Sequence, residues 1–381
     1  MQTLNDMRPV YVIGVGMHKY QFASDTLYID MGLTAVRGAL SDAGIEFPQI
    51  ESAHIGCTGI GMAAGRIMFN HLGSTGLACT QVENASASGS SAFQMAVLEV
   101  AAGRRDVALA VGVDKYGDQV RAVAKEKVNR LSDTASIPLV KYAIMAEYLK
   151  KKKGLSAEDL ARVASKNHTN ASKNPFAQFQ KPRSVEQVLA STLVAGTTTS
   201  LMCCPRGDGA AAAIVASEDA IHRLGINGDK PIRVTASVLQ SERPQVGREI
   251  PSVTLAQRVA EMAYAEAGIT PDALDVVELH DAFAIEEILY TETFGLAPKG
   301  EGQHFLRDGG SAIGGKCCVN SSGGLIGQGH PLGPTGLGQI HEITRQLRGE
   351  NGERQQPDAK IGMAHMIGLG SISIAHILQK D

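Results

Sequence analysis

The sequence predicts an α/β protein made of two similar halves, and three observations lead to this fold class. An apolar strand over 10–16 is followed by a helix over 28–43, so a βα unit opens the chain. The end of that helix, Asp42-Ala43-Gly44-Ile45, recurs 224 residues later as Glu266-Ala267-Gly268-Ile269. Glycine is abundant at 42 residues while aromatic residues make up only 4%, a composition that suits close contacts between helices and sheets.

The residues after each helix end also match. A second amphipathic helix is expected over 254–267, and both helices end at a glycine, a residue that commonly follows a helix terminus. Each helix is followed by a turn with proline, an apolar anchor and a strand: Pro48, Ile50 and 52–56, then Pro271, Leu274 and 276–280. A repeat of half the chain length indicates two α/β halves rather than a solenoid, whose period is about 20–50 residues. We expect each half to bring strand-end loops to one shared site.

The middle of the chain changes character. The stretch 119–193 is helical and charged, which indicates an inserted loop domain. Its lysine run 150–153 is more simply explained as a solvated helix end than as a phosphate-binding patch. Strand patterns return at 209–216 and 232–238, where they most simply complete the first sheet. The expected division is a first half over 1–118 and 194–250, the insertion over 119–193, and a second half over 251–381.

Composition excludes several classes of protein. A net charge of −3, from 36 basic and 39 acidic residues, argues against a general nucleic-acid or membrane-surface binder. Six cysteines include two adjacent pairs and no C-x-x-C pair, so we expect reduced thiols and no metal site. No run of 18 apolar residues and no secretory leader pattern is present, so a soluble, cytoplasmic protein without membrane insertion is expected.

The most informative segment is Val82-Glu83-Asn84-Ala85-Ser86-Ala87-Ser88-Gly89-Ser90-Ser91-Ala92, which precedes a helix expected over 93–102. Its small side chains let a backbone approach a ligand closely. Ser86 comes just before the helix N-terminus, where free N–H groups and the helix dipole favour negative charge. That is a suitable place for a nucleophile, although a serine-rich helix cap would have a similar sequence.

A second segment, 320–336, places His330 among many glycines and prolines. Pro334 can begin a helix that runs to about Arg348, so His330 lies in a rigid loop just ahead of a helix start. A histidine held in this way is expected to be a positioned base, whereas the alternative is a purely structural role. The glycine spacing fits neither dinucleotide-binding nor phosphate-binding loops.

Two further segments complete the set. In Glu278-Leu279-His280-Asp281-Ala282-Phe283-Ala284, His280 comes at the carboxyl end of an expected strand, where it can form a hydrogen bond with a substrate oxygen. The segment 362–370, which ends at Gly370, is expected to be a glycine-rich loop before a final apolar strand. Taken alone, that loop could be an ordinary turn.

These four segments together resemble the thiolase superfamily, and most of all its sterol-carrier-protein-type and archaeal acetoacetyl-CoA members. Those proteins carry V-E-N-A-C-A-S-G-S-S-A, H-D-A-F or H-D-C-F, G-G-x-x-x-x-G-H-P-x-G-x-T-G and a terminal H-x-I-G loop, and the resemblance runs from Val10 to Leu378. It implies a five-layered αβαβα fold with an inserted loop domain and a homodimer. It also implies coenzyme A as a substrate, no permanently bound cofactor, and a small OB-fold zinc-ribbon partner protein.

The resemblance also implies roles for individual residues. Ser86 takes the place of the nucleophilic cysteine, His330 is the base that activates it, and His280 helps to form an oxyanion hole. Backbone N–H groups near Ser86 and Gly370 would supply a second hole. The chain departs from the family at its second acid/base cysteine, because Ala282 and Met366 occupy the two familiar positions for that residue.

Serine at position 86 changes the expected chemistry. A cysteine thiolate is accessible near neutral pH, whereas an alkoxide is not, so serine needs its proton removed as it attacks. Three explanations are open: an engineered cysteine-to-serine change, a natural serine with altered chemistry, or a binding subunit that has lost activity. The first is favoured because the immediate neighbours of Ser86 match the active motif.

The resulting functional hypothesis is an acyl-CoA C-acyltransferase of lipid or acyl-CoA metabolism. It would cleave a β-ketoacyl-CoA with CoA, or run the reverse Claisen condensation. A thiolase-like aldolase that splits a β-hydroxyacyl-CoA without a covalent intermediate is the alternative. A non-catalytic CoA- or lipid-binding subunit is a third, against which the retained His280 and His330 argue.

Overall fold

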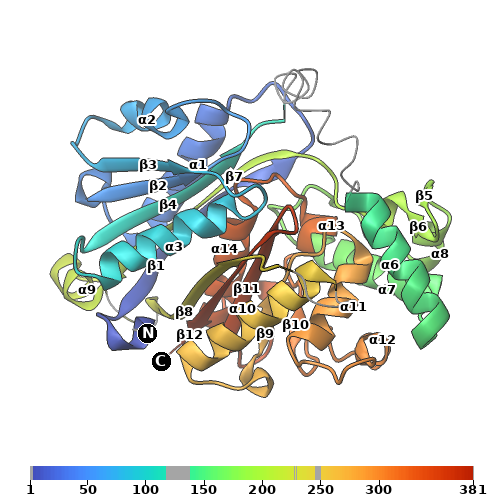
Figure 1. The fold of residues 1–381 in the computed structure, drawn as a ribbon. Helices are drawn as coiled ribbons and strands as arrows, with labels where there is room; N and C mark the ends of the chain where they lie inside the picture. Colours follow the sequence, from blue (N-terminus) through green and yellow to red (C-terminus); the bar gives the residue numbers. More distant parts are fainter. Residues whose placement is uncertain (1–2, 117–137, 227, 229, 245–249, 381) are drawn as a thin grey trace.

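The computed structural model describes residues 3–116, 138–226, 228, 230–244 and 250–380. Its described strands form one ten-stranded sheet and one two-stranded sheet. The large sheet consists of two sets of five strands that have the same internal order and meet edge to edge (Figure 1). Each set carries its own helices, so the two-half organisation expected from the sequence is confirmed.

The first set has the order β3-β2-β4-β7-β1. Within it, β2 is parallel to both β3 and β4, and β7 is antiparallel to both β4 and β1. The strands span Val10–Gln21 (β1), Ser52–Gly56 (β2), Ala78–Val82 (β3), Val107–Asp114 (β4) and Asp208–Ser217 (β7).

The second set repeats this arrangement as β10-β9-β11-β12-β8, with the same parallel and antiparallel neighbours. Its strands span Ile232–Ser241 (β8), Val276–Glu278 (β9), Cys318–Val319 (β10), Ile361–Gly368 (β11) and Ile372–Gln379 (β12). The two sets join where β1 pairs with β8, at Tyr11 with Arg233 and Val12 with Ile232. These two pairs are the only strand pairing between the halves among the described residues.

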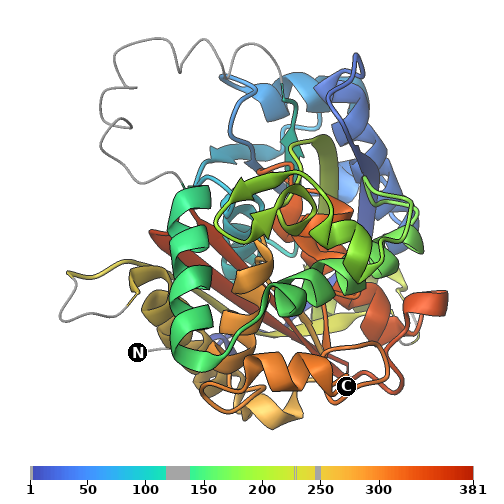
Figure 2. The same cartoon turned by 90° about the vertical axis from the view of Figure 1, so that its right-hand side faces the viewer.

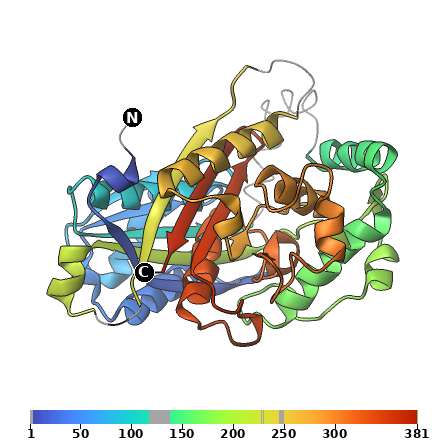
Figure 3. The same ribbon diagram turned by 90° about the horizontal axis from the view of Figure 1, so that it is seen from below.

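Helices form three layers around the two sets of strands. On the outer faces, α1 (Tyr28–Ala43) packs on the first set and α10 (Pro251–Ala267) on the second, as Figures 1 and 3 show. Between the sets lie α3 (Ser88–Ala101) and α14 (Thr335–Arg348), which share one hydrophobic core with strands of both halves. The chain therefore has the five-layered αβαβα architecture, with both central helices starting next to the segments that carry Ser86 and His330.

Most boundaries of the repeat agree with the sequence. The helix α1 spans the expected residues and ends at Gly44, which adopts a left-handed φ of 69°. The two proline-containing turns both form 3-10 helices, over Phe47–Gln49 and Pro271–Ala273. The helix α10 begins earlier than expected, at Pro251, because proline suits the first helical position.

Three expectations need correction. The strand β8 does not complete the first set, because it pairs with β12 at eight positions and is the second set's counterpart of β1. The helix α3 begins at Ser88 rather than at residue 93. The expected glycine loop over 362–370 is mostly strand β11, whose pairing with β12 leaves only 369–371 as a turn.

The insertion is helical in the part that the structure describes, and Figure 2 shows it on one side of the molecule. It contains α6 (Pro138–Lys153), α7 (Ala157–Ser172) and α8 (Val185–Leu189), and the hairpin of β5 (Leu193–Ala195) and β6 (Thr198–Thr199) follows at its expected end. Its core is shared with α11 (Ala284–Thr293) and α13 (Gly324–Gln328) of the second half. The lysines at 150–153 form an exposed helix end, as expected. The first part of the expected insertion, residues 119–137, lies outside the described residues.

The remaining helices lie at the periphery: α2 (Ala64–Phe69), α9 (Glu218–Leu224) and α12 (Gly302–Arg307). Further 3-10 helices span Leu4–Asp6, Asn70–Leu72, Ser200–Met202 and Gly352–Arg354. Within the described ranges, no helix is long and apolar enough to cross a membrane.

Candidate active site

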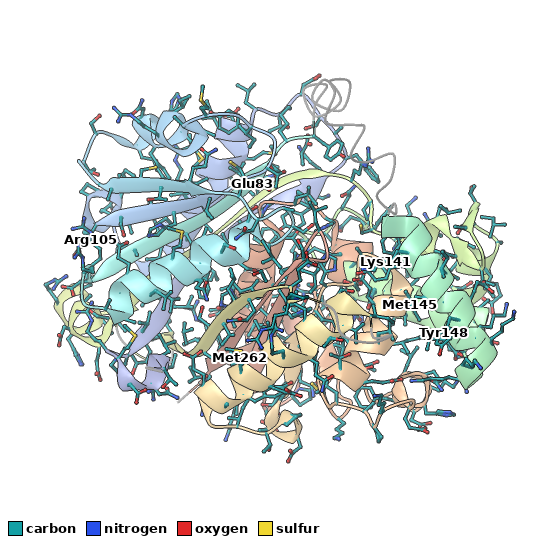
Figure 4. All side chains as sticks on the ribbon, viewed as in Figure 1. Glu83, Arg105, Lys141, Met145, Tyr148 and Met262 are labelled. Carbon is teal, nitrogen blue, oxygen red and sulfur yellow. The ribbon has the colours of Figure 1, made fainter. Side chains whose placement is uncertain are left out.

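Ser86 lies in a tight turn between β3 and α3. The preceding Ala85 has a left-handed φ of 50°, a conformation that is unusual for a residue with a side chain. The turn is closed by Glu83, which is labelled in Figure 4 and whose carboxylate accepts a hydrogen bond from the Ala85 N–H at 2.6 Å. Ser88 accepts a second hydrogen bond from the Asn84 N–H at 2.9 Å. The strained turn presents Ser86 just ahead of the first residue of α3.

His330 contacts the Ser86 hydroxyl directly. Its Nε2 lies 3.1 Å from Ser86 Oγ, and its Nδ1 lies 2.9 Å from Thr335 Oγ1. The single hydroxyl hydrogen of Thr335 is donated to the Pro331 carbonyl oxygen at 2.5 Å. Thr335 must therefore accept from His330 Nδ1–H, because it has no second hydrogen to give. The neutral ring then has its Nε2 lone pair directed at the Ser86 O–H.

The environment keeps this imidazole neutral. Burial, and to a lesser extent the nearby His280, lower the pKa of His330 well below its ordinary value. A neutral ring with a free lone pair is the form that can remove a proton. Ser86 and His330 therefore have the geometry and the protonation state of a nucleophile and its general base.

Close backbone contacts hold the loops of the two halves together. A Cβ on Gly89 of α3 would overlap the carbonyl oxygen of Gly333, in the loop after His330. A Cβ on Gly368, at the end of β11, would overlap the carbonyl oxygen of Asn84. Glycine is required at these two positions because the backbones themselves are in contact.

A buried carboxylate adds a second link between the halves. Asp114, at the end of β4, accepts hydrogen bonds from the Gly333 N–H at 2.5 Å and from the Thr58 N–H at 2.8 Å. It thereby fixes the loop that carries His330 to the first half of the molecule.

His280 lies just beyond β9, as the sequence predicted. Its Nδ1 is 3.1 Å from Glu286 Oε1, and Glu286 Oε2 accepts a hydrogen bond from the Phe283 N–H at 3.0 Å. The ring stands perpendicular to that of His330, with the ring centres 5.5 Å apart. The structure thus brings Ser86, His280 and His330 together from three distant segments of the chain.

Gly370 lies in the turn between β11 and β12, with φ of 77°, and follows Leu369, which has φ of 48°. Among the described residues, the Gly370 N–H donates to no loop carbonyl, and the Ser86 backbone forms an isolated β-bridge with Asn84. Lys141 of α6, labelled in Figure 4, approaches this turn, since a Cβ on Gly370 would lie 3.6 Å from its Nζ. The insertion therefore reaches the edge of the site.

The two positions of the second cysteine carry no acidic group. Met366 is fully buried against Ala87 and Ile374. Ala282 is also buried, and its carbonyl oxygen accepts a hydrogen bond from the N–H of Cys204 at 2.8 Å. The described residues contain no cluster of three or more side chains that could hold a metal ion.

Sequence reasoning missed the side chains that orient the two histidines. Thr335 follows His330 by five residues in the quoted motif, and its hydroxyl was a usable signal. Glu286 lies in the first turn of α11, six residues after His280, where an acidic residue is expected for the helix dipole alone. Glu278 was also missed as a support: its carboxylate binds the backbone N–H of Ser322 at 2.9 Å and anchors the loop that leads to His330.

Comparison with known proteins identifies the family of the chain. The family model for the thiolase N-terminal domain matches residues 10–190, and the model described as thiolase C-terminal domain-like matches residues 240–380. Benzoylsuccinyl-CoA thiolase subunit BbsB of Thauera aromatica is 38% identical over 95% of both chains. Acetyl-CoA acetyltransferase of Methanothermobacter thermautotrophicus is 38% identical over 98% of this chain and 100% of its own. Sterol carrier protein 2 of Oryctolagus cuniculus is 35% identical over 96% of this chain and 71% of its own.

Solved structures show the same fold at lower identity. The Ltp2-ChsH2(DUF35) aldolase superposes with a TM-score of 0.84 at 23% identity and covers 98% of both chains. Human mitochondrial 3-ketoacyl-CoA thiolase superposes with a TM-score of 0.74 at 19% identity, over 98% of this chain and 99% of its own. The matches to both family models and to relatives above 30% identity show that the chain belongs to the thiolase family of acyl-CoA acyltransferases.

Proposed function

We propose that this chain transfers acyl groups between coenzyme A thioesters through its Ser86–His330 pair. The reaction is cleavage of a β-ketoacyl-CoA by CoA, or the reverse Claisen condensation. The observation that supports it most is the 3.1 Å contact between Ser86 Oγ and a nitrogen of His330 whose lone pair is free to accept the hydroxyl proton.

In this proposal, His330 removes the Ser86 proton as Oγ attacks the β-keto carbonyl. The tetrahedral oxygen that forms carries negative charge, and backbone N–H groups near Ser86 and Gly370 stabilise it. His280 lies 5.5 Å from His330 between ring centres, and in its protonated form it donates a hydrogen bond to the thioester oxygen on the other side of the bond that breaks. CoA then attacks the resulting ester and releases the second acyl-CoA.

Serine makes these reaction steps slower than cysteine would. An alkoxide is not populated near neutral pH, so the proton must leave in the same step as the attack. The oxygen ester is also a less activated acyl donor than a thioester. We therefore expect a lower rate for the Ser86 form than for a cysteine form on the same scaffold.

The proposal extends to assembly and location. We propose a homodimer that works in the cytoplasm with a small OB-fold zinc-ribbon partner protein. All six cysteines are free in the structure, which fits a reducing compartment. One curated relative is named as a thiolase subunit, and one solved neighbour is named as an aldolase of two components. Co-purification of the chain with a co-expressed small OB-fold zinc-ribbon protein, followed by mass measurement, would test this.

A second candidate function is a retro-aldol cleavage of a β-hydroxyacyl-CoA. The observation that favours it is the lack of a thiol at all three positions where the family's chemistry uses one, Ser86, Ala282 and Met366. Retro-aldol cleavage needs a base and an oxyanion site but no covalent intermediate. In that case His330 would accept the proton of the β-hydroxyl group, and Ser86 would only bind substrate.

Substitution at position 86 distinguishes these functions. We would assay CoA-dependent cleavage of β-ketoacyl-CoA and retro-aldol cleavage of β-hydroxyacyl-CoA in the unaltered chain, Ser86→Cys and Ser86→Ala, each with the partner present. Acyl transfer predicts that Ser86→Cys is faster and Ser86→Ala inactive. An aldolase predicts that Ser86→Ala keeps retro-aldol activity. Neither activity in any form, with CoA binding intact, would leave a binding subunit as the function.

A further inference from the structure

The proposed acyl transfer needs a group that moves a proton at the Cα of the acyl-CoA. When the carbon–carbon bond breaks, an enolate remains that must be protonated, and in the next half-reaction the CoA thiol must lose its proton. Neither Ala282 nor Met366 can exchange a proton, and His330 is already committed to Ser86. The chain must therefore supply another acid/base group if it carries out this reaction.

The contacts of His280 determine which of its nitrogens is free. Glu286 receives the Phe283 N–H at 3.0 Å, and its other oxygen has the Tyr290 hydroxyl at 3.4 Å, so its carboxylate acts as a hydrogen-bond acceptor. The third contact, from His280 Nδ1 at 3.1 Å, is then a donated N–H as well. In the neutral ring this places the lone pair on Nε2. Such a ring can accept a proton at Nε2, and it can donate from Nε2 only after it has accepted one.

The Nε2 atom is also accessible. It forms no hydrogen bond with a described residue. It is also not one of the fully buried polar atoms without a partner, so part of its surface is open to solvent. About 8% of the His280 side chain is exposed, whereas Glu286, on the Nδ1 side, is fully buried. The exposed part of the ring is therefore the edge away from Glu286, beside the Ser86–His330 pair.

We propose that His280 is the acid/base catalyst for the Cα proton, and that Glu286 is the positioning residue that holds its tautomer and stabilises its imidazolium form. This inference rests on the proposed acyl transfer and adds to it the group that replaces the missing cysteine. The arrangement of a histidine between a reacting group and a buried carboxylate suits reversible proton transfer.

The steps balance over one cleavage cycle. Imidazolium His280 gives its Nε2 proton to Cα as the Cα–Cβ bond breaks, and the released acyl-CoA leaves with that proton. Neutral His280 then takes the proton of the CoA thiol while the sulfur attacks the Ser86 ester. The Ser86 oxygen leaves and recovers its proton from His330. Both histidines end in the states in which they began, and no oxidant or reductant is consumed.

The nearest thiol does not fit this role. Cys204 is joined to Ala282 through its backbone N–H, so it lies next to one position of the missing cysteine. Burial, together with the Asp281 and Glu286 carboxylates, raises the pKa of the Cys204 thiol. A thiol held in its protonated form cannot act as the base for either proton.

Exchange of Cα protons for deuterium tests the proposal without requiring turnover. The full chain with its partner would be incubated in D₂O with acetyl-, propionyl- or succinyl-CoA, and the loss of the Cα proton signal followed by NMR. The variants are His280→Asn, Glu286→Gln and the matched control Cys204→Ser, with CoA affinity and thermal unfolding measured for each. Asparagine keeps an amide donor for an oxyanion but cannot exchange a proton.

We expect the unaltered chain to exchange protons in at least one of the three thioesters. His280→Asn should lower the rate at least about 100-fold, in line with the usual contribution of a general base, while CoA affinity changes less than about threefold. Glu286→Gln should lower it about tenfold, and Cys204→Ser should leave it unchanged.

Three results would overturn the assignment: no exchange by the unaltered chain, normal exchange in His280→Asn, or loss of exchange in Cys204→Ser alone. Acylation of Ser86→Cys by acyl-CoA requires no Cα proton transfer, so it separates this inference from the proposed function. If that variant acylates while His280→Asn exchanges normally, only the role of His280 fails.

Discussion

At the scale of single residues, the site depends on hydrogen bonds that select one tautomer for each histidine. Thr335 receives the Nδ1–H of His330 because its own hydrogen is used by Pro331. In the same way, Glu286 accepts the Nδ1–H of His280. Ser86, His330 and His280 could be singled out from the sequence. Thr335 was overlooked although it stands in the same motif as His330, and Glu286 could not be singled out, since a glutamate in the first turn of a helix is expected for the helix dipole alone.

The first residue-scale prediction concerns Thr335→Val. This change preserves the shape of the side chain but leaves His330 Nδ1 without an acceptor, so the ring can turn or change tautomer. We expect acyl-transfer activity to fall at least about tenfold with little change in CoA affinity. The matched control is Thr344→Val on the same helix, because the buried Thr344 hydroxyl has no hydrogen-bond partner. Equal kinetics in the two variants would contradict the orienting role of Thr335.

A second prediction concerns the base itself. His330→Ala in the Ser86→Cys background should abolish acyl transfer, because the base acts on the transition state more than on bound substrate. CoA affinity, measured by calorimetry, should stay within about tenfold. Loss of CoA binding together with intact turnover would show that His330 binds the ligand and is not the base.

At the scale of elements, the two central helices set the position of the loops that carry Ser86 and His330. The start of α14 near Pro334 was expected from the sequence, as were α1, the end of α10 and the strand before His280, whereas α3 begins five residues earlier than expected. The sequence could not show that β8 pairs with β12, because an apolar strand pattern does not indicate which strand it pairs with. Nor could it show that β11 continues to Gly368, since the glycines of 362–370 also fit a loop.

The element-scale prediction is Gly89→Ala. A methyl group there would overlap the Gly333 carbonyl oxygen, so α3 and the His330 loop would have to move apart. Alanine in a helix is normally favourable by about 1 kcal/mol, whereas overpacking costs about 1–3 kcal/mol. We expect net destabilisation in denaturant unfolding and a larger proportional loss of activity. In the control Gly38→Ala the nearest atom would lie 3.3 Å away, so a much smaller effect is expected. A stabilised and fully active Gly89→Ala would show that the contact is not required.

At the scale of the whole molecule, a buried acidic network supports the loop before His330. Burial, and next the neighbouring Glu342, raise the pKa of Glu278 to about 7. The unfolded chain would titrate near pH 4.3, so the folded state binds the proton more tightly. The stability that this proton contributes is fully present below about pH 4.3 and is lost as the pH rises through about 7.

Glu278→Gln should remove this dependence. The free energy of unfolding of the variant, relative to the unaltered chain, should increase between pH 5 and pH 8 by up to about 3 kcal/mol. The difference is the informative quantity, because glutamine also loses hydrogen bonds to Ser321 and Ser322 at every pH. Denaturant titrations at four pH values would measure it. A difference that is flat or decreases with pH would contradict a protonated Glu278 in the folded state.

The division into two halves follows from the sequence repeat, and the structure shows why the halves need each other. Ser86 comes from the first half and both histidines come from the second, so the site exists only where the strand-end loops meet. The side chain of Ser86 touches His330 across 244 positions of sequence. That contact could be proposed from a family resemblance, but no local pattern of residues indicates it.

The central claim is that position 86 is the acyl acceptor. Intact-protein mass spectrometry after incubation with a panel of acyl-CoAs, in the presence of the proposed partner protein, tests it most directly. We predict an added mass of one acyl group on Ser86→Cys, because the helix start and His330 remain in place to stabilise a thiolate. The adduct should map to the peptide that contains position 86 and be absent from Ser86→Ala. No adduct on the cysteine variant, or an adduct that maps elsewhere, would contradict the account.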